Sequence, residues 1–510
     1  MYVLTAQNMK HAEEKANNGG LSYYTMMERA GNACGDIIAK CDKNSKTVIL
    51  CGKGKNGGDG LVIAGRLWQK GFRNIFVILV HGEITDKLCL EMYENMIKYP
   101  VVVTDFEKNS ETAEYHIETA DIIVDSVFGI GFKGELADNS LKAIELANLN
   151  KNAYKFAVDI PSGLSAEGSY CGQTYFCADE TLSMIAYKPV HVIKPTALFC
   201  GKTTVIDIGI APEYVAEFAE DYTVLTESEA TGNIKKRTYN DHKGTYGKVL
   251  TICGSKNMTG CVYLCNQAAV EIGAGLVISA FPECVYSAVT PKLNEPVFLP
   301  LEYNENGRIS HLACKKLLEK MADASVIAIG CGIGVDSDTK QLVEFVLENA
   351  QCPVVLDADG LNCISKNTDA LKNAECDVII TPHPGEMARL AGKTVAEIEQ
   401  NRIKTAMEFA KEYGVTVLLK GANTVVADKN GRITVNTTGN PSMARGGSGD
   451  VLTGIIAGLV PQTQDVYAAA CTGAYIHGLT GDFVTEKYGE LAATPTRVVE
   501  NLNMALKRGS

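Results

Sequence analysis

The sequence "NPSMARGGSGDVLTGIIAGL", residues 440–459, could hold a phosphate group during its transfer. Gly446, Gly447 and Gly449 come directly before an apolar run with helical spacing. Glycines let successive backbone N–H groups turn inward, and the positive end of the following helix points to the same place. Asp450 lies at the rim of this anion hole, where its carboxylate would accept the proton of an attacking hydroxyl. The alternative is a plain helix cap after a flexible turn, which requires neither the paired glycines nor this order of residues.

A second glycine-rich segment, "CGKGKNGGDGLVIAGRLWQKG" at residues 51–71, follows a short apolar run. Gly52, Gly54 and Gly57 satisfy the GxGxxG spacing of dinucleotide-binding turns. This spacing is weak evidence by itself, because the acidic residue expected after the second strand is at best the distant Glu83. The adjoining "NGGDG" adds side-chain oxygens beside backbone that a ligand can approach closely. We therefore interpret the segment as a ligand loop, with a purely structural turn as the alternative.

Polar side chains also follow later apolar runs of this half, in "VDSVFGIGFKGE" and "VDIPSGLSAEG". The carboxyl ends of parallel strands converge on one crevice, so we expect four of these side chains to face one another, namely Asn56, Asp125, Asp159 and Ser162. Oxygen ligands of this kind suit a hard cation. Taken singly, each aspartate is equally consistent with a helix cap or a turn. Lys133, between two glycines, supplies a cation and a candidate acid or base.

Two sheets are needed to position these residues, because short β-branched runs alternate with amphipathic stretches in each half of the chain. Such alternation predicts an α/β fold with parallel sheets and helices on both faces. The runs of the first half are 47–51, 75–80, 121–127, 156–160, 181–186 and 203–209. Those of the second half are 248–254, 276–280, 325–330, 353–359, 377–383, 415–421 and 424–428. The polar span 211–240 carries little core signal, so we expect a boundary near residue 220 and domains at 1–220 and 221–510.

The composition limits the class of protein and its partners. A chain of 510 residues that is 46% hydrophobic is long enough for two or more domains. Its formal charge of -12 argues against a general binder of nucleic acid or anionic membrane, although a local basic pocket stays possible. We expect small-molecule partners, no nucleic acid, no membrane, and a homo-oligomer.

The start of the chain and its cysteines indicate the compartment. "MYVLTAQNMKHAEEK" has no basic segment followed by an apolar one, and we find no apolar run of the ~18 residues that would span a bilayer. We therefore expect a cytoplasmic protein. The seventeen cysteines form no CxxC pair, and the closest spacing is Cys261 to Cys265. Reduced core thiols explain them better than a metal site or a disulfide framework.

Four segments of the first half resemble the NAD(P)H-hydrate epimerase domain: "MMERAG" 26–31, "GKNGGDGLVIA" 54–64, "VDSVFGIGFKG" 124–134 and "DIPSGLSAEG" 159–168. The family usually has Asn where Lys55 stands. The resemblance implies a three-layer, Rossmann-like domain that epimerises C6 of hydrated NAD(P)H, with Asp159 and Lys133 as candidate catalytic residues. It implies potassium bound by Asn56, Asp125 and Ser162. It also implies that the hydrate contacts Lys55, Asn56, Gly57, Gly58, Asp59, Gly129, Ile130, Gly131, Phe132, Lys133, Gly134, Glu135 and Asp159.

The GxGD order at Asp450 resembles the ribokinase-like kinases. The neighbouring segments narrow this to the ADP-dependent NAD(P)H-hydrate dehydratase, over nearly all of 235–505: "DHKGTYGKVLTICGS" 241–255, "EIGAGLVISA" 271–280, "IGCGIG" 329–334, "LDADGLN" 356–362, "TPHPGEMARL" 381–390 and "LLKGANTVVAD" 418–428. The family usually has Pro at position 331 and Ala at position 261, where this chain has cysteines.

This second resemblance implies the contacts of two ligands. The adenosine phosphates of ADP, the co-substrate, would contact Lys420, Gly421, Ala422, Asn423, Thr424 and Gly449. The hydrate would contact Cys261, Gly332, His383 and Asp450, with Asp450 as the base. Asp357 and Asp359 are candidates to support Mg²⁺, or simply cap a strand end.

Together the two resemblances imply a fused repair enzyme. Its first domain would interconvert the R and S hydrates, and its second would dehydrate the S form to NAD(P)H with ADP, giving AMP and phosphate. One alternative is a vitamin or sugar kinase of ribokinase-like type with an N-terminal nucleotide-binding module. Another is that the first half is a nonenzymatic nucleotide- or partner-binding module.

Overall fold

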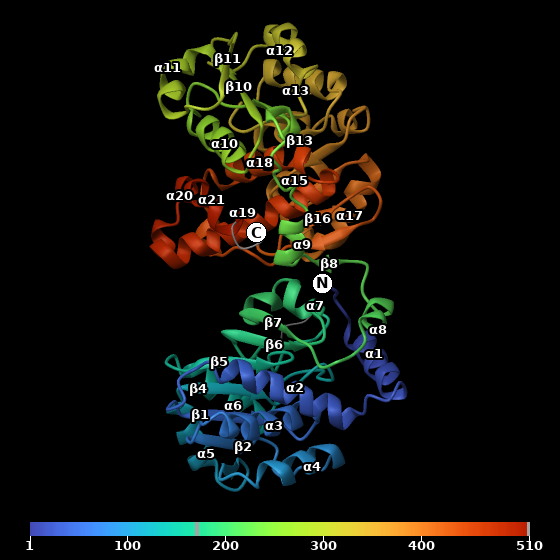
Figure 1. Ribbon diagram of the computed structural model, residues 1–510, viewed down its shortest axis with the longest axis vertical. Coiled ribbons are helices and arrows are strands. Elements are labelled where there is room, and N and C mark those ends of the chain that lie inside the picture. Colours follow the sequence, from blue (N-terminus) through green and yellow to red (C-terminus); the bar gives the residue numbers. More distant parts are fainter. Residues whose placement is uncertain (169–172, 507–510) are drawn as a thin grey trace. The chain divides into compact units, whose positions relative to one another are not determined.

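The computed structural model describes residues 1–168 and 173–506. The chain folds as two compact units, Met1–Tyr222 and Thr223–Ser510. In Figure 1 the first unit is coloured blue to green and the second green to red. Each unit is described below by itself.

The first unit is built on a seven-stranded sheet in the order β3-β2-β1-β4-β5-β6-β7, and all its strand pairs are parallel. The strands are β1 (Thr47–Cys51), β2 (Ile75–Leu79), β3 (Val102–Asp105), β4 (Ile122–Ser126), β5 (Tyr154–Val158), β6 (Glu180–Met184) and β7 (Lys202–Ile206). The helices are α1 (Ala6–Asn18), α2 (Tyr23–Ile38), α3 (Lys55–Gln69), α4 (Lys87–Met96), α5 (Ser110–Glu118), α6 (Asp138–Leu149), α7 (Pro189–Val192) and α8 (Pro212–Glu217).

Helices cover both faces of this sheet, which gives three layers. Ile49 and Cys51 of β1 belong to a core cluster shared with α1 to α4. Val48 and Leu50 of the same strand belong to a second cluster, shared with α5 and α6. Successive side chains of a strand point to opposite faces, so a strand buried on both faces is a continuous apolar run. This confirms the predicted three-layer α/β architecture.

The second unit has a ten-stranded sheet in the order β11-β10-β9-β12-β13-β14-β15-β16-β17-β8. Its strands are parallel except where β16 pairs with β15 and with β17. They are β8 (Thr223–Val224), β9 (Lys248–Ile252), β10 (Leu276–Pro282), β11 (Val297–Leu301), β12 (Val326–Ile329), β13 (Val354–Leu356), β14 (Val378–Ile380), β15 (Thr416–Leu419), β16 (Val425–Ala427) and β17 (Ile433–Val435).

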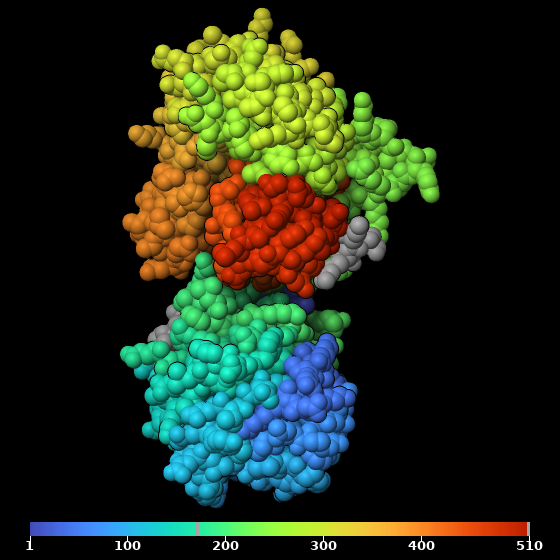
Figure 2. Space-filling model, turned by 90° about the vertical axis from the view of Figure 1, so that its left-hand side faces the viewer, coloured from blue at the N-terminus to red at the C-terminus, as the bar shows by residue number. Residues whose placement is uncertain are grey.

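The helices of the second unit are α9 (Glu227–Gly232), α10 (Gly260–Glu271), α11 (Tyr286–Val289), α12 (Cys314–Met321), α13 (Ser337–Asn349), α14 (Ala358–Ile364), α15 (Pro384–Ala391), α16 (Val395–Gln400), α17 (Arg402–Tyr413), α18 (Ser448–Leu459), α19 (Val466–Tyr488), α20 (Pro495–Glu500) and α21 (Leu502–Leu506). Residues of α10 and α18 to α21 form one core cluster with the central strands. Figure 2 shows the C-terminal part of the chain (red), which contains α18 to α21, flanked by the yellow-green and orange segments of the same unit.

Several predicted strands extend past the observed ones at their carboxyl ends. Runs 353–359 and 377–383 were expected as strands, but β13 ends at Leu356 and β14 at Ile380. The next polar residues leave the sheet and cap helices: Asp357 is the N-cap of α14, and His383 is the N-cap of α15. These strand ends are the places where polar side chains gather.

The span 211–240 is more ordered than its polar composition indicated. It contains α8, the short strand β8 and α9. Val215, Val224 and Ala230 are buried in it, and β8 completes the edge of the second sheet beside β17. Within the residues that the structure describes, we find no helix long and apolar enough to cross a membrane.

Candidate functional site

The "NGGDG" segment is not a loop, because helix α3 already begins at Lys55. The glycines allow this helix to pack closely. A Cβ on Gly57 would lie 1.9 Å from the carbonyl oxygen of Gly52, and one on Gly58 would lie 2.6 Å from the Met27 sulfur. The segment expected as a ligand loop is therefore the first turns of a helix held against the end of β1.

The three expected cation ligands of the first unit lie together at the carboxyl ends of neighbouring strands. The Asp125 carboxylate is fully buried and accepts hydrogen bonds from the Ser162 N–H and hydroxyl, both at 2.7 Å. The Ser162 hydroxyl also accepts the Phe128 N–H at 3.0 Å. Asn56 donates its side-chain N–H to the Phe128 carbonyl at 2.9 Å. Asn56 and Ser162 are thus linked through one residue, Phe128.

Burial raises the pKa of Asp125 to about 6, although hydrogen bonds from Ser162 and Val127 oppose this shift. A buried carboxylate is costly unless a positive charge compensates it. The described contacts of Asp125 are hydrogen bonds alone and include no cationic side chain. The cluster therefore has the chemistry of a small cation site.

Asp159 lies at the end of β5 with a left-handed backbone, φ 66°. Its carboxylate is 2.5 Å from the ammonium of Lys188 and accepts the Met184 N–H at 3.2 Å. Lys188 has an exposed fraction of 0% and also donates to Ser183 and to the Met184 carbonyl. Strained backbone at a buried ion pair is typical of a functional position.

Two further acidic side chains surround this pair. Burial raises the pKa of Glu13, while the nearby ammonium groups of Lys55 and Lys188 oppose that shift. Burial and the carboxylates of Asp159 and Glu13 raise the pKa of Asp59. Perturbed carboxylates that lie near one another and near Asp159 mark a candidate catalytic site.

The sequence analysis missed Glu13 and Lys188, and it chose Lys133 as the cation instead. Lys133 is exposed on the segment between β4 and α6, and has no hydrogen bond or ion pair within residues 1–168 and 173–506. The rest of its stretch, Gly129 to Glu135, is likewise exposed or half-buried. Lys188 follows an apolar run, "SMIAY". A lysine directly after an apolar run could have been recognised as a candidate buried residue. The sequence does not show, however, which carboxylate such a lysine will pair with.

In the second unit, Asp450 lies in the first turn of α18, as the sequence predicted. The N-cap is Gly447, with φ 99°. The N–H groups of Gly446, Gly447 and Gly449 donate no hydrogen bond to the described part of the chain. They remain available to an anion, which the positive end of the helix also favours.

A half-buried lysine and two buried carboxylates meet the start of this helix. Lys420 is 2.7 Å from Asp357 and 3.9 Å from Glu386. Asp357 also accepts the Thr453 hydroxyl at 2.8 Å. A Cβ on Gly449 would lie 3.4 Å from the Lys420 ammonium and 3.5 Å from the Asp357 carboxylate. The glycine nest, the lysine and the aspartate therefore form one site.

The electrostatics of this site act strongly on Asp450. Burial raises the pKa of Asp450 to about 9; the Cys331 thiol and the Asp357 carboxylate add to the shift, and the Lys420 ammonium opposes it. Once ionised, a carboxylate with a raised pKa is a stronger proton acceptor than an ordinary one.

The "KGANT" segment, residues 420–424, turns sharply after β15. Asn423 has a left-handed backbone, φ 57°, and the Thr424 hydroxyl donates to the Gly421 carbonyl at 2.9 Å. Arg402, which was not among the predicted site residues, stabilises the start of this turn. Its guanidinium donates to the carbonyls of Leu419 and Lys420 at 2.9 and 3.2 Å. Ala422 lies within the same turn.

The remaining expected contacts of the hydrate, and Asp359, a candidate to support Mg²⁺, have structural roles. The Cys261 thiol donates to the carbonyls of Met258 and Cys331 and lies beneath Gly332, where an added Cβ would be 2.4 Å from its sulfur. His383 caps α15 by accepting the Gly385 N–H at 2.9 Å. Asp359 accepts the Gly334 N–H at 2.9 Å.

Comparisons with known proteins give family matches for both units. A family model described as NAD(P)H-hydrate dehydratase matches residues 249–503, and one described as YjeF-related protein N-terminus matches residues 23–190. The chain is 37% identical to the bifunctional NAD(P)H-hydrate repair enzyme of Moorella thermoacetica, covering 99% of this chain and 97% of that protein. It is 31% identical to the Escherichia coli enzyme of the same name, over 98% and 93%.

A solved structure gives the fold of the second unit. A ribokinase-like superfamily protein from Enterococcus faecalis matches with a TM-score of 0.51 and 24% identity, over 57% of this chain and 97% of that one. The second unit is therefore ribokinase-like, as the sequence predicted. Because the similarity to the repair enzymes extends over both units, the chain belongs to the family of bifunctional NAD(P)H-hydrate repair enzymes.

Proposed function

We propose that this protein restores NAD(P)H from its hydrates, with epimerisation in the first unit and dehydration in the second. The observation that carries the proposal is the position of Asp450 beside the glycine nest, Lys420 and Asp357. This arrangement supplies a base, a phosphate site and a positive charge at one helix start. The alternative of a vitamin or sugar kinase leaves the buried Asp159–Lys188 site of the first unit without a role.

Dehydration requires the C6 hydroxyl of the hydrate to become a good leaving group. Asp450 accepts the proton of that hydroxyl as its oxygen attacks the terminal phosphorus of the nucleotide. The N–H groups of the glycine nest and the Lys420 ammonium bind the charged phosphate oxygens. The ring-nitrogen lone pair then expels phosphate from C6, and loss of a proton from C5 restores the dihydropyridine.

We propose ADP as the phosphate donor, with AMP and phosphate as the products beside NAD(P)H. A glycine nest accepts a phosphate from ADP or from ATP, so it does not discriminate between the two donors. The resemblance of "KGANT" to the nucleotide segment of the ADP-dependent family is what supports ADP. The test is a product assay on separated nucleotides, using mixed hydrate epimers and ATP freed of ADP. We expect AMP to form with ADP. Rapid turnover with ATP and none with ADP would overturn the assignment.

We propose that Mg²⁺ arrives with the nucleotide phosphates. The Asp357 carboxylate is already bound to Lys420 and Thr453, and Asp359 accepts a backbone N–H. These side chains do not fit a dedicated magnesium cage, which demands octahedral oxygen ligands. No step of the reaction above depends on the ion.

Epimerisation requires the ring nitrogen to add to C6 from either face. Opening the C6–N bond of the hydrate gives an aldehyde, and closing it on the other face inverts the centre. The hydroxyl proton passes to the ring nitrogen on opening and returns to the oxygen on closure. We propose that Asp159 carries this proton and that Lys188 acts as a positioning residue, holding the carboxylate in place. Lys133, which is exposed, takes no part in the step.

We propose that Asn56, Asp125 and Ser162 bind potassium near this centre. They offer oxygens with one formal negative charge, which suits a monovalent cation better than Ca²⁺ or Mg²⁺. The buried, uncompensated Asp125 carboxylate supports the fit. We expect potassium to raise both the epimerisation rate and the melting temperature, and Asn56→Ala to weaken both effects. Equal rates and melting temperatures in potassium and in tetramethylammonium buffer would count against the site.

We propose the cytoplasm as the compartment, since the sixteen cysteines that the structure describes are all free thiols. A homo-oligomer stays a prediction, which sedimentation of the full chain would check.

A further inference from the structure

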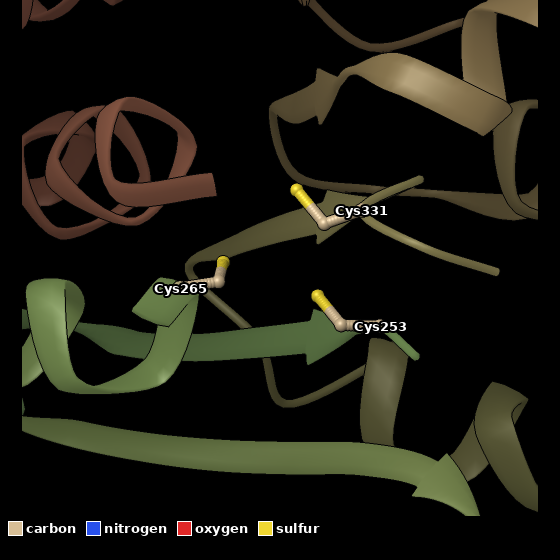
Figure 3. A group of neighbouring side chains, drawn as sticks. All are labelled: Cys253, Cys265 and Cys331. Carbon is tan, nitrogen blue, oxygen red and sulfur yellow. The ribbon is translucent and has the colours of Figure 1, made fainter. Parts of the chain in front are cut away.

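Three cysteines from three different elements converge inside the second unit, as Figure 3 shows. Cys253 follows β9, Cys265 lies in α10, and Cys331 follows β12. All three are fully buried. Their sulfur atoms all lie within 4.8 Å of one another. The reaction proposed above uses none of these thiols.

The spacing of the sulfurs is close to that of thiolates bound to one zinc ion. Zn–S bonds of about 2.3 Å place tetrahedral sulfur ligands about 3.8 Å apart. Sulfurs within 4.8 Å would therefore need to close by about 1 Å at most to bind one ion. Side-chain rotation of a cysteine can supply a movement of that size without moving the strands.

The chemistry around the thiols favours a cation. Cys331 is 4.0 Å from an Asp357 carboxylate oxygen. Its thiol also contributes to the raised pKa of Asp450, so a second carboxylate lies near the trio. A soft sulfur set with an oxygen beside it suits Zn²⁺.

We propose that Cys253, Cys265 and Cys331 form a zinc site, with the carboxylate of Asp450 as the fourth ligand. Binding replaces the three thiol protons, and any proton on Asp450, with four bonds to Zn²⁺. No electrons are transferred. Because Asp450 would then be unable to accept a proton, zinc would inhibit dehydration and leave epimerisation unaffected. The inhibition rests on the proposed role of Asp450, whereas the binding does not.

The binding test uses reduced full-length protein, stripped of metal, and Co²⁺ as the spectroscopic probe. We expect one equivalent of Co²⁺ to give sulfur-to-cobalt charge-transfer bands and tetrahedral ligand-field bands, and Zn²⁺ to abolish both. Cys265→Ala should lose the bands. Cys471→Ala, which removes a buried thiol elsewhere in the same unit, should keep them. No charge-transfer band in the folded wild-type protein, or the same band in Cys265→Ala, would overturn the site.

The activity test compares the same proteins with and without Zn²⁺. We expect saturating Zn²⁺ to lower dehydration by about a hundredfold in the wild type, the scale of losing a general base. Epimerisation should not change, and Cys265→Ala should keep its dehydration in zinc. Cobalt bands accompanied by uninhibited dehydration would refute Asp450 as the fourth ligand. Absence of dehydration in every zinc-free sample supplied with Mg²⁺ and ADP would instead refute the proposed function.

Discussion

A buried aspartate at the end of a parallel strand, paired with a lysine, is present in each unit. Lys188 meets Asp159 at 2.5 Å after β5, and Lys420 meets Asp357 at 2.7 Å after β13. Breaking such a pair by removing one partner leaves an uncompensated buried charge, which costs about 3–5 kcal/mol. Both pairs therefore fix the charge at their sites more firmly than surface ion pairs would.

His191 makes the first of these sites sensitive to acid. Its Nδ1 accepts the Lys188 N–H at 3.0 Å, and its Nε2 donates to the Asp159 carbonyl at 2.9 Å. Burial, together with the nearby Lys188 ammonium, lowers the pKa of His191 to about 3. The folded protein thus holds the neutral ring where the unfolded chain, with a pKa of 6.5, would be protonated.

This shift predicts a loss of stability in acid. The pKa of His191 is lower in the folded protein than in the unfolded chain, so the stability that the neutral ring contributes is fully present above pH 6.5. That stability is lost as the pH falls from 6.5 toward 3. We expect His191 to cost the first unit about 1.4 kcal/mol per pH unit in that window. Urea unfolding followed by the fluorescence of Trp68, the only tryptophan, measures it. The slope should be shallower in His191→Gln; equal slopes would show that another group is responsible.

Asp450→Asn should stop dehydration and leave epimerisation intact. The amide keeps the shape of the side chain but cannot accept the hydroxyl proton, so we expect kcat for dehydration to fall by about 10²–10⁴. The measurement follows the return of NAD(P)H absorbance from mixed hydrates with ADP. The epimerisation rate of the same sample is the internal control. Near-normal dehydration would show that Asp450 is not the base.

The placement of site residues was predictable where a general rule of the fold applies. Asn56, Asp125, Asp159 and Ser162 were predicted to meet because the carboxyl ends of parallel strands converge. Asn56, Asp125 and Ser162 do lie together, whereas Asp159 pairs with Lys188. Lys188 and Glu13 could not be found in this way. Their approach to Asp159 depends on how α1 and the segment after β6 pack, and no spacing in the sequence records that.

At the scale of elements, the positions of the buried central strands were predictable from the sequence, whereas those of short strands and edge strands were not. Runs buried on both faces, such as β1 at Thr47–Cys51, are continuous and apolar, so they stand out. None of the predicted strands covers β3, β8, β11 or β17. These strands are half-exposed, short or at a sheet edge. Such strands take their register from a neighbour, and their own sequences carry a weak pattern.

Two glycines at the start of α3, Gly57 and Gly54, should respond very differently to substitution by alanine. A Cβ at Gly57 would lie 1.9 Å from the Gly52 carbonyl oxygen, whereas one at Gly54 would meet nothing within 4 Å. We expect Gly57→Ala to destabilise the first unit by about 2–3 kcal/mol and to slow epimerisation, because Asn56 would move. Gly54→Ala should cost at most about 1 kcal/mol, as a change at a helix cap. Urea unfolding followed by Trp68 fluorescence checks both, and similar losses would refute the packing argument.

At the scale of the molecule, each unit has its own sheet and its own core clusters. The closing residues of the first unit are part of its structure: the Glu220 N–H donates to the Val3 carbonyl at 2.8 Å, and Tyr222 is buried. The opening residues of the second unit are equally integrated, since Thr223 begins β8 at the edge of the sheet. A unit that buries its own core can in principle fold alone.

The point of division therefore decides whether the units can be separated. We expect fragment 1–222 to fold and epimerise, and fragment 223–510 to fold and dehydrate with ADP. A matched fragment, 241–510, lacks β8 and α9, and with them the buried side chains of Val224 and Ala230 and the hydrogen bond from Asn233 to Thr472. It should melt at a clearly lower temperature than 223–510. If 241–510 matched 223–510 in melting temperature and dehydration, the polar span would be a simple linker after all, and if neither fragment folded, the two units would not be independent.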